Sequence, residues 1–289
     1  MPDEKAVSRF YPDTYYGNDG QKFTASIEYL VGMLANRRIK FLTRGLPKQA
    51  RILDVGCGRG LTLKRLADQG FDVHGLEHSQ HATRGIDERV QLKIATDLPS
   101  AAYPDSHFDL IIIWHVLEHL IDPVATLREA HRILRPSGRL VVAVPNYSSF
   151  QARWTGTGWF HLDLPRHLYQ FPAVGLKRLI SDAGFDVNSE HHFSMRYNPF
   201  GWVQSVLNQF EGLPRNGLYE LLHQTAPGVP SRFTPTQRLQ FLTAYVLGMP
   251  FGLAMSVLDA CLRQGATIHL VATSRSAAAT VIEQLGNSL

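Results

Sequence analysis

Strand-like and helix-like segments alternate five times across residues 51–145, and this alternation limits the folds that the chain can adopt. Short apolar runs end at turn residues, and most are followed by a segment whose apolar positions have helical spacing. The run FDLIIIW at 108–114 is almost continuously apolar, as expected of a central strand covered on both faces. The pattern predicts right-handed βαβ units and a doubly wound, mostly parallel α/β sheet.

The same spacing rules predict the remaining elements. A helix is expected over 24–45, before the first strand, and another over 172–185. Strands are expected at 51–55, 71–77, 90–95, 108–114, 139–145, 185–193 and 266–274.

Composition narrows the class of protein. The 289 residues are 44% hydrophobic and 19% charged, which fits one large globular domain or a core with an appendage. The net charge of +4 is mild and Lys and Arg are scattered singly, so we expect no nucleic-acid partner. Cys57 and Cys261 form neither a disulfide framework nor a zinc spacing, and the first ten residues lack an apolar signal region. A cytoplasmic location is therefore expected.

The stretch LDVGCGRG at 53–60 lies where the first strand turns into the first helix of the alternation. Ligands of open α/β sheets bind at such turns, and Gly56, Gly58 and Gly60 would let the backbone approach a ligand closely. A dinucleotide fingerprint needs a glycine at the position of Leu61. The spacing G-x-G-x-G behind Asp54 therefore disfavours a nicotinamide cofactor.

This spacing resembles motif I of the class I S-adenosylmethionine-dependent methyltransferases. The resemblance covers about 48–195 and the final strand, and it is strongest to the small-molecule group that includes the ubiquinone-biosynthesis O-methyltransferases. It implies a Rossmann-like sheet of seven strands with an antiparallel last strand, and S-adenosyl-L-methionine as cofactor. In that family Glu77 would hydrogen-bond the ribose hydroxyls, and Asp97 would meet the adenine amine with Leu98 beside the ring. The cofactor-binding residues that the resemblance implies are Asp54, Gly56, Cys57, Gly58, Gly60, Glu77, His78, Asp97, Leu98, Trp114 and His115.

The stretch HVLEH at 115–119 matches a zinc-peptidase pattern, which requires all five residues on one helix. Here His115 directly follows a predicted buried strand, so we interpret the stretch as a wall of the methyl-transfer cleft, bordered by Trp114 and His115. Some ubiquinone-pathway relatives place a divalent metal at this turn, with ligands that match Glu118 and His119. Because His115 replaces a further carboxylate of that pattern, no metal ligand is predicted.

A hydroxyl acceptor would benefit from a nearby base, for which histidine is suited because its pKa lies near neutrality. Location selects His115, at the cofactor cleft, and His161 and His167, in the stretch WFHLDLPRHLYQF at 159–171. These three are the predicted catalytic residues. An alternative stays open, in which His167 and Arg166 only cross-link the loop.

An apolar insertion occupies 197–265, and its segment 239–262 contains a single charge, Asp259. Gly248, Pro250 and Gly252 predict that the segment breaks into a helical hairpin. Three interpretations remain: a buried cap over the acceptor, an interfacial lipid or membrane contact, and an oligomer contact. The preceding helix has a candidate apolar face made of Trp202, Val203, Val206, Leu207 and Phe210.

Three regions are predicted: a methyltransferase core at 48–196 and 266–289, the insertion at 197–265, and an N-terminal helical lid at 1–47, which the resemblance implies. The lid would carry Tyr11, Tyr15 and Tyr16, and the alternative stays open that these aromatic residues only pack on the N-terminal helix. The expected function is methyl transfer from S-adenosylmethionine to a small, apolar or lipid-linked acceptor, with oxygen favoured over nitrogen. The alternatives are a nicotinamide-dependent oxidoreductase and a non-catalytic, cofactor-binding assembly partner. Membrane association is an alternative to a purely cytoplasmic location, and the oligomeric state is left open.

Overall fold

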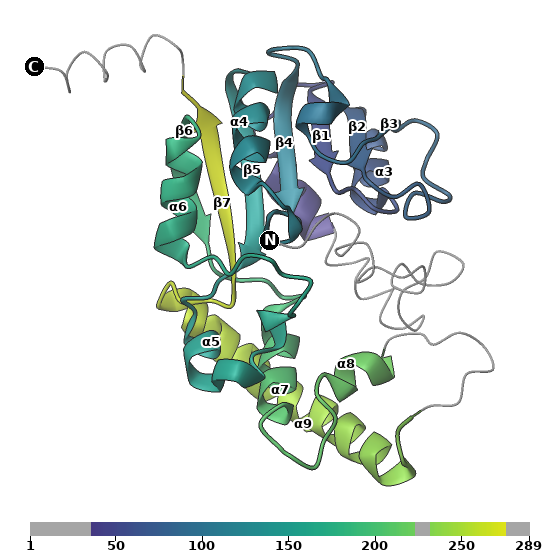
Figure 1. The fold of residues 1–289 in the computed structure, drawn as a ribbon, viewed down its shortest axis with the longest axis vertical. Coiled ribbons are helices and arrows are strands. Elements are labelled where there is room, and N and C mark those ends of the chain that lie inside the picture. Colours follow the sequence, from purple (N-terminus) through teal and green to yellow (C-terminus); the bar gives the residue numbers. More distant parts are fainter. Residues whose placement is uncertain (1–35, 223–231, 276–289) are drawn as a thin grey trace, which may run out of the picture. The chain divides into compact units, whose positions relative to one another are not determined.

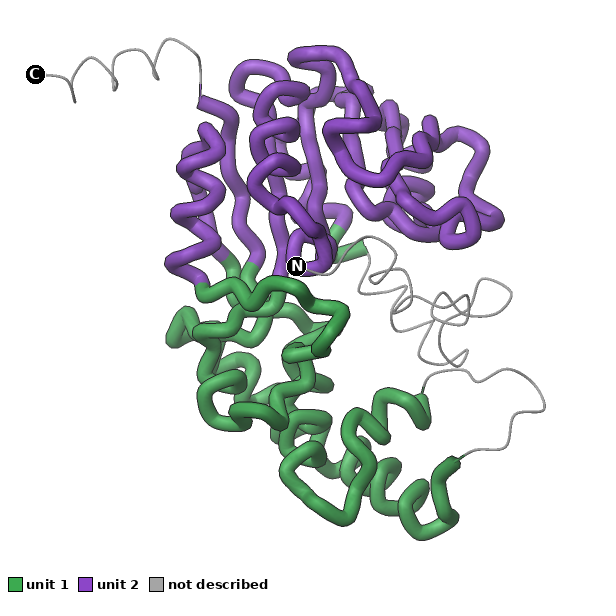
Figure 2. Tube along the Cα trace, viewed as in Figure 1, with its two compact units in different colours: residues 1–38, 145–172, 191–268 green, residues 39–144, 173–190, 269–289 purple. Residues whose placement is uncertain are grey.

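The computed structural model describes residues 36–222 and 232–275. Most of the predicted lid, with Tyr11, Tyr15 and Tyr16, lies outside these residues. The chain divides into two compact units, drawn in different colours in Figure 2. Unit 1 comprises 1–38, 145–172 and 191–268, and unit 2 comprises 39–144, 173–190 and 269–289.

Unit 2 is built on a seven-stranded sheet in the order β3-β2-β1-β4-β5-β7-β6. Strands β1 to β5 pair in parallel, and β7 runs antiparallel to them (Figure 1). This order confirms the predicted doubly wound α/β fold with its antiparallel last strand. The strands are β1 (Arg51–Val55), β2 (Asp72–Glu77), β3 (Gln91–Ile94), β4 (Phe108–Trp114), β5 (Leu134–Pro145), β6 (Phe185–His191) and β7 (Thr267–Ser274).

Helices cover the sheet because its central strands are apolar on both sides. A helix whose described part covers 36–43 packs with α3 (Leu61–Ala67) on one face, against alternate strand residues such as Leu110 and Ile112. The intervening residues of β4, Ile111 and Ile113, are also fully buried, so the opposite face is covered too. The helices α4 (Pro123–Ile133) and α6 (Ala173–Asp182) supply further buried apolar side chains.

Unit 1 is helical in its described residues. Its helices are α5 (Phe150–Thr155), α7 (Asn198–Leu207), α8 (Gly217–Leu222) and α9 (Pro235–Cys261). Helix α7 packs against α9, and a cluster of buried apolar side chains joins α7, α8 and the start of α9. That cluster comprises Val203, Leu207, Leu218, Phe233 and Phe241.

The predicted hairpin at 239–262 is wrong, because α9 is one continuous helix of 27 residues. Pro250 lies inside it at an exposed position, where proline lacks the N–H that would donate to the carbonyl four residues earlier. The two glycines face α7: a Cβ on Gly252 would lie 2.5 Å from the Pro199 carbonyl oxygen, and one on Gly248 would lie 3.1 Å from the Val203 side chain. Both residues therefore permit close helix packing instead of breaking the helix.

The beginning of α9 is specified by the stretch TPTQ at 234–237. The Thr234 hydroxyl accepts the Gln237 backbone N–H at 3.1 Å, and the Gln237 side chain accepts the Thr234 N–H at 3.1 Å. Pro235 occupies the first helical position. This capping box is a strong helix start signal, and it lies before the apolar segment from which the hairpin was predicted.

The predicted apolar face of the preceding helix is largely confirmed. Trp202, Val203 and Leu207 are buried in α7, but Phe210 lies beyond the helix end and is 58% exposed. The Trp202 indole N–H donates to Asp259 Oδ2 at 2.8 Å. Burial raises the pKa of Asp259 to about 6, although this hydrogen bond from Trp202 opposes the shift.

We predict that Gly252→Ala destabilises the protein, because the new methyl group meets a backbone carbonyl that cannot rotate away. Overpacking of this kind costs about 1–3 kcal/mol, so the melting temperature should fall by several degrees. Gly212→Ala is the control, since nothing lies within 4 Å of its added methyl group. Equal melting temperatures for the two variants in thermal denaturation would contradict the proposed close contact.

Candidate functional site

The glycine loop after β1 is held against the end of β2 by its own backbone. The N–H groups of Gly56 and Cys57 both donate to the Leu76 carbonyl, at 2.8 and 3.1 Å. The Gly60 N–H then donates to the Cys57 carbonyl at 3.0 Å, and Gly60 caps α3. The loop therefore lies at the carboxyl edge of the sheet, where ligands of this fold class bind.

Each of the three glycines has a positive φ, a conformation that other L-residues rarely adopt. A Cβ on Gly56 would lie 2.5 Å from the Val116 side chain, and one on Gly60 would lie 2.6 Å from Ile86. Gly58 differs, since nothing lies within 4 Å of the position of its Cβ. Its peptide is thus the part of the loop that a ligand could approach.

Glu77, the last residue of β2, is buried and accepts several hydrogen bonds. Its carboxylate receives the Gly58 N–H at 2.9 Å and the His78 N–H at 3.0 Å, and it lies 2.9 Å from His78 Nδ1. Burial alone would raise the pKa of Glu77, but the hydrogen bonds from His78 and Gly58 lower it below its ordinary value. The carboxylate is therefore ionised at neutral pH and accepts hydrogen bonds only, which suits it to bind hydroxyl groups.

Cys57 points its side chain toward β2. A Cβ on Gly75 would lie 2.7 Å from Cys57 Sγ, so the absence of a side chain at Gly75 makes room for the thiol. Burial raises the pKa of the Cys57 thiol, and the charges of Asp54 and Glu77 add to this effect. The thiol is therefore neutral and contributes packing to the loop.

The other cofactor residues predicted from the first three strands end at the same edge. Asp54 is buried within β1, and His78 is exposed directly after β2. After β3, Asp97 is exposed and its carboxylate accepts the Ser100 N–H at 2.8 Å, while Leu98 is fully buried. Because β1, β2 and β3 are parallel neighbours, their carboxyl ends bring these residues to one edge of the sheet.

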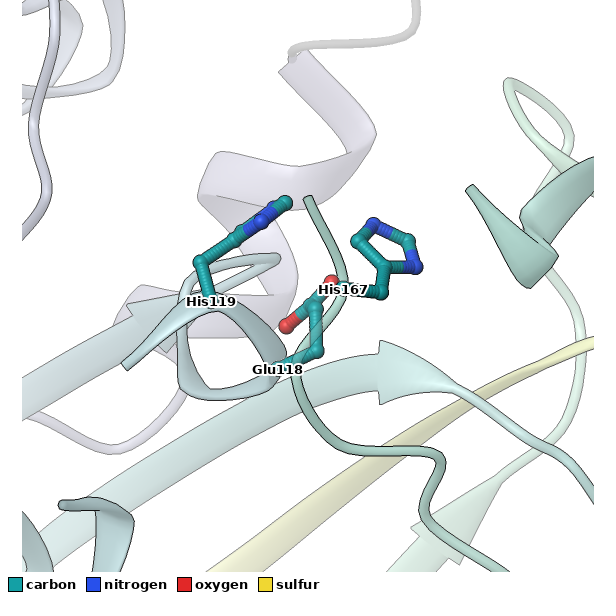
Figure 3. A group of neighbouring side chains, drawn as sticks. All are labelled: Glu118, His119 and His167. Atoms are coloured by element: carbon teal, nitrogen blue, oxygen red, sulfur yellow. The ribbon is translucent and has the colours of Figure 1, made fainter. Parts of the chain in front are cut away.

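The stretch HVLEH straddles the end of β4 and the one-turn helix η3 (Leu117–His119). His115 continues the sheet ladder, its N–H donating to the Ala143 carbonyl at 2.8 Å, and has a φ of 53°. Its Nδ1 lies 3.2 Å from Glu118 Oε1, and Glu118 is only 1% exposed. Figure 3 shows Glu118 and His119 on this turn. Since the five residues share no helix, the zinc-peptidase interpretation is wrong.

Trp114 precedes this turn and packs on the sheet. Its ring stacks on His269 of β7, with centroids 4.7 Å apart and an angle of 27° between the planes. It also packs against the core cluster that contains Leu63 and Ile112. The roles of Trp114 and His115 in cofactor binding stay predictions.

The other two predicted catalytic histidines belong to unit 1. His161 is buried in η5 (Phe160–Leu162), and a Cβ on Gly201 of α7 would lie 2.9 Å from its Nε2. His167, which is also drawn in Figure 3, is buried, and its Nδ1 lies 2.8 Å from the His161 carbonyl oxygen. The Arg166 guanidinium bonds Asp163 at 2.5 Å. These contacts cross-link the loop, and the catalytic role of either histidine stays a prediction.

Sequence reasoning missed the apolar side chains that hold the glycine loop in place. Val116 packs against Gly56 and Ile86 packs against Gly60, each within a distance that excludes any larger residue at the glycine. Val116 lies inside HVLEH, but the metal-binding pattern is defined by the polar residues of that stretch and gives no signal for the valine. Ile86 follows β2 in a region without periodic spacing, so no sequence signal identified it.

Comparison with known proteins assigns the fold and the site to a class. A family model described as a methyltransferase domain matches residues 28–190, more than half of the chain. The chain belongs to this family. It is an S-adenosylmethionine-dependent methyltransferase, and S-adenosylmethionine is its cofactor. The nicotinamide-dependent and non-catalytic alternatives are thereby set aside.

Relatives and solved structures agree with this class. A ubiquinone biosynthesis O-methyltransferase of Cereibacter sphaeroides is 29% identical over 198 residues, covering 62% of this chain and 77% of the relative. A probable S-adenosylmethionine-dependent methyltransferase of Mycolicibacterium smegmatis is 31% identical over 140 residues, covering 47% of this chain and 52% of the relative.

Two solved structures share the fold. A phosphoethanolamine N-methyltransferase of Haemonchus contortus, solved with S-adenosylhomocysteine, has a TM-score of 0.55 at 14% identity, covering 95% of this chain and 60% of that one. The [4+2]-cyclase SpnF has a TM-score of 0.52 at 21% identity, covering 83% and 81% of the two chains. Since these proteins carry different activities in their names, the fold alone does not fix the acceptor.

We predict that Gly58→Ala weakens S-adenosylmethionine binding by about tenfold, because the methyl group occupies the open side of the loop. Gly70→Ala is the matched control: Gly70 also has a positive φ and open space, but it follows α3 at the opposite end of that helix. Both variants should lose similar stability, about 1–2 kcal/mol, from the strained backbone. Calorimetry in which both variants lose affinity equally would contradict the assignment of Gly58 to the ligand side.

Glu77→Gln should weaken S-adenosylmethionine binding by about 10- to 100-fold, since hydrogen bonds to a charged group are worth about 1.5–3 kcal/mol. The lowered pKa of Glu77 keeps the wild-type carboxylate ionised at pH 5 and above. Its contribution to affinity should therefore be constant from pH 5 to pH 8 and be lost as the pH falls through the lowered pKa. An unchanged affinity in the variant, measured by calorimetry at pH 7, would remove Glu77 from the cofactor site.

Proposed function

We propose that the chain methylates an oxygen atom of a small, apolar or lipid-linked acceptor. Supporting this, several relatives 26–29% identical to the chain are named ubiquinone biosynthesis O-methyltransferases. The observation that carries the proposal furthest is His115, a histidine in a strained conformation at the carboxyl end of β4, beside a buried carboxylate. Residues held at positive φ often lie at functional sites.

The reaction is an in-line displacement. The acceptor oxygen attacks the methyl carbon as the bond from that carbon to the sulfonium breaks, which yields the methyl ether and S-adenosylhomocysteine. The hydroxyl proton must leave in the same process, so a neutral imidazole can assist as general base. Orientation of the two reactants supplies most of the remaining acceleration.

His115 is the favoured base because its ring is oriented. In the tautomer whose Nδ1–H donates to Glu118 Oε1, the Nε2 atom carries the lone pair that accepts a proton. Glu118 is then a positioning residue, and its carboxylate also stabilises the imidazolium that forms. This pairing resembles the carboxylate–histidine arrangement of other enzymes that remove a hydroxyl proton.

His161 and His167 stay candidates with a weaker argument, since both are buried and the loop contacts account for their positions. Their packing predicts that alanine at either position lowers stability as well as turnover. A catalytic role requires turnover to fall further than the folded fraction does.

We predict that His115→Ala lowers kcat by about 100-fold, the usual contribution of a general base, and changes S-adenosylmethionine affinity less. Glu118→Gln should lower kcat less than His115→Ala does, because the imidazolium that forms loses its partner. His191→Ala, at an exposed position at the end of β6, serves as the control. Full turnover in His115→Ala would exclude it as the base and direct attention to His161 and His167.

The acceptor itself is tested by transfer of labelled methyl from S-adenosylmethionine. Phenolic, quinone-precursor and lipid-linked hydroxyl compounds form one arm, and amines of similar size form the other. Mass spectrometry of the product identifies the methylated atom. Transfer to amines alone would overturn the proposal of O-methylation without affecting the cofactor assignment.

We also propose that the chain is cytoplasmic and reaches lipid through segment 197–265. Support comes from the apolar composition of that segment, because a lipid-linked acceptor requires access to the membrane surface. Cell fractionation tests the location, with recovery in the membrane fraction that is reversed by salt or carbonate as the expected result.

A further inference from the structure

Helix α9 exposes large apolar side chains along one whole side. At 3.6 residues per turn the exposed apolar positions occupy about half of the helix circumference, opposite to the buried positions Gly252, Ser256 and Asp259. The side chain of Leu247, for example, is 72% exposed. Contiguous exposed apolar side chains of this kind mark surfaces that bind a protein or a membrane. We name this the α9 apolar face, and it consists of Leu239, Leu242, Val246, Leu247, Phe251, Leu253, Val257 and Leu258.

The α9 apolar face contains no charge. Between Arg238 and Arg263 the only charged residue is Asp259, which is buried on the opposite side and bonded to Trp202. Arginine therefore brackets the helix at both ends, while the exposed side between them is apolar. Such a surface is complementary to a bilayer with anionic headgroups, since the apolar face can enter the acyl boundary while the arginines meet the headgroups.

An exposed indole extends the same surface. Trp154 of α5 is 57% exposed, and its ring lies 5.7 Å from that of Trp202, which is in turn 6.3 Å from the ring of Phe251. Trp154 therefore lies close to the α9 apolar face within unit 1. Tryptophan is enriched at the level of the lipid headgroups, where its ring is apolar and its N–H is polar.

The topology decides how such a helix would meet a bilayer. Helix α9 is long and apolar enough to cross a membrane by length and composition. The segment that contains it, however, leaves the sheet at β6 and returns at β7, and these strands are neighbours in the sheet. A single crossing would leave the two strands on opposite sides of the membrane. The described helix α7, with 10 residues, measures about 15 Å and is too short to provide a return crossing of about 30 Å.

We propose that the α9 apolar face is a peripheral membrane-binding surface, with the helix lying in the plane of an anionic lipid bilayer. This inference deepens the proposed function, because it names the surface and the lipid class for the contact through segment 197–265. The inner side of α9 fits the in-plane orientation: the polar side chains of Ser256 and Asp259 are buried, and Asp259 accepts a hydrogen bond from Trp202 of α7, away from the exposed side. The exposed polar residues on this side of α9, Gln240 and Thr243, lie near the start of the helix. From Leu247 to Leu258 every exposed side chain is apolar, unlike the mixed, hydrogen-bonded surface of most protein partners.

The test uses the full chain and vesicles of phosphatidylcholine, with or without phosphatidylglycerol, in a flotation assay. Wild-type protein should float with the anionic vesicles and bind neutral ones more weakly. The double variant Val246→Glu/Leu247→Glu should bind the anionic vesicles about tenfold less, because two charges enter the apolar face. Val174→Glu is the matched control, since Val174 is 76% exposed on α6 in unit 2. It should float like the wild type.

A second measurement remains informative if the double variant folds poorly. Of the four tryptophans, Trp154 is the most exposed, so its fluorescence emission should shift to shorter wavelength when vesicles are added. Trp154→Phe should remove that shift while thermal unfolding and S-adenosylmethionine binding are unchanged. Lack of any shift in the wild type would contradict the proposal.

Three results would overturn the proposed surface. The first is that wild-type protein floats with neither kind of vesicle. The second is that Val174→Glu loses flotation as strongly as the double variant. The third is a wild-type dimer that binds no vesicles and becomes monomeric in the double variant, which would assign the face to a second copy of the chain. Vesicle binding without transfer to any hydroxyl acceptor would refute O-methylation and leave the membrane surface intact.

Discussion

The Leu76 carbonyl accepts two successive backbone N–H groups, and the candidate cofactor site depends on this bifurcated contact. It turns the chain back immediately after β1, so that the Gly58 N–H points to the Glu77 carboxylate. The same N–H is one reason why Glu77 stays ionised although it is buried. One peptide turn therefore determines the shape of the loop and contributes to the charge of Glu77, the residue predicted to bind the cofactor's ribose hydroxyls.

Much of unit 2 could be predicted from the sequence because its strands are apolar on both sides. The predicted strand positions at 51–55 and 108–114 agree with β1 and β4, since a buried strand must end where turn residues begin. The edge strand β3 is shorter than predicted. Its side chains are mostly exposed, unlike those of β1 and β4, so burial does not determine where the strand begins and ends. The glycine spacing pointed to the loop, but the packing of Val116 and Ile86 against it required the structure.

Unit 1 shows where reasoning from local propensity fails. Gly248, Pro250 and Gly252 would weaken an isolated helix, and yet α9 passes through all three. The packing of both glycines against α7 outweighs the low helix propensity of glycine and proline. The capping box at Thr234 sets the first turn of α9. The histidines of 159–171 were chosen by location in the chain, whereas the structure shows contacts within the loop that explain their burial. Residue type and spacing alone could not distinguish a catalytic histidine from one that only cross-links the loop.

The neighbouring positions of β6 and β7 have a consequence for how this chain can change over evolutionary time. Antiparallel neighbours can be joined by a turn of two residues, so the sheet does not need the long segment between them. Insertions, deletions and changes of composition in 192–266 therefore need not alter the register of β1, β2 and β4, whose carboxyl ends form the candidate cofactor site. A family built in this way can keep one methyl donor and diversify the rest of the molecule around a constant sheet.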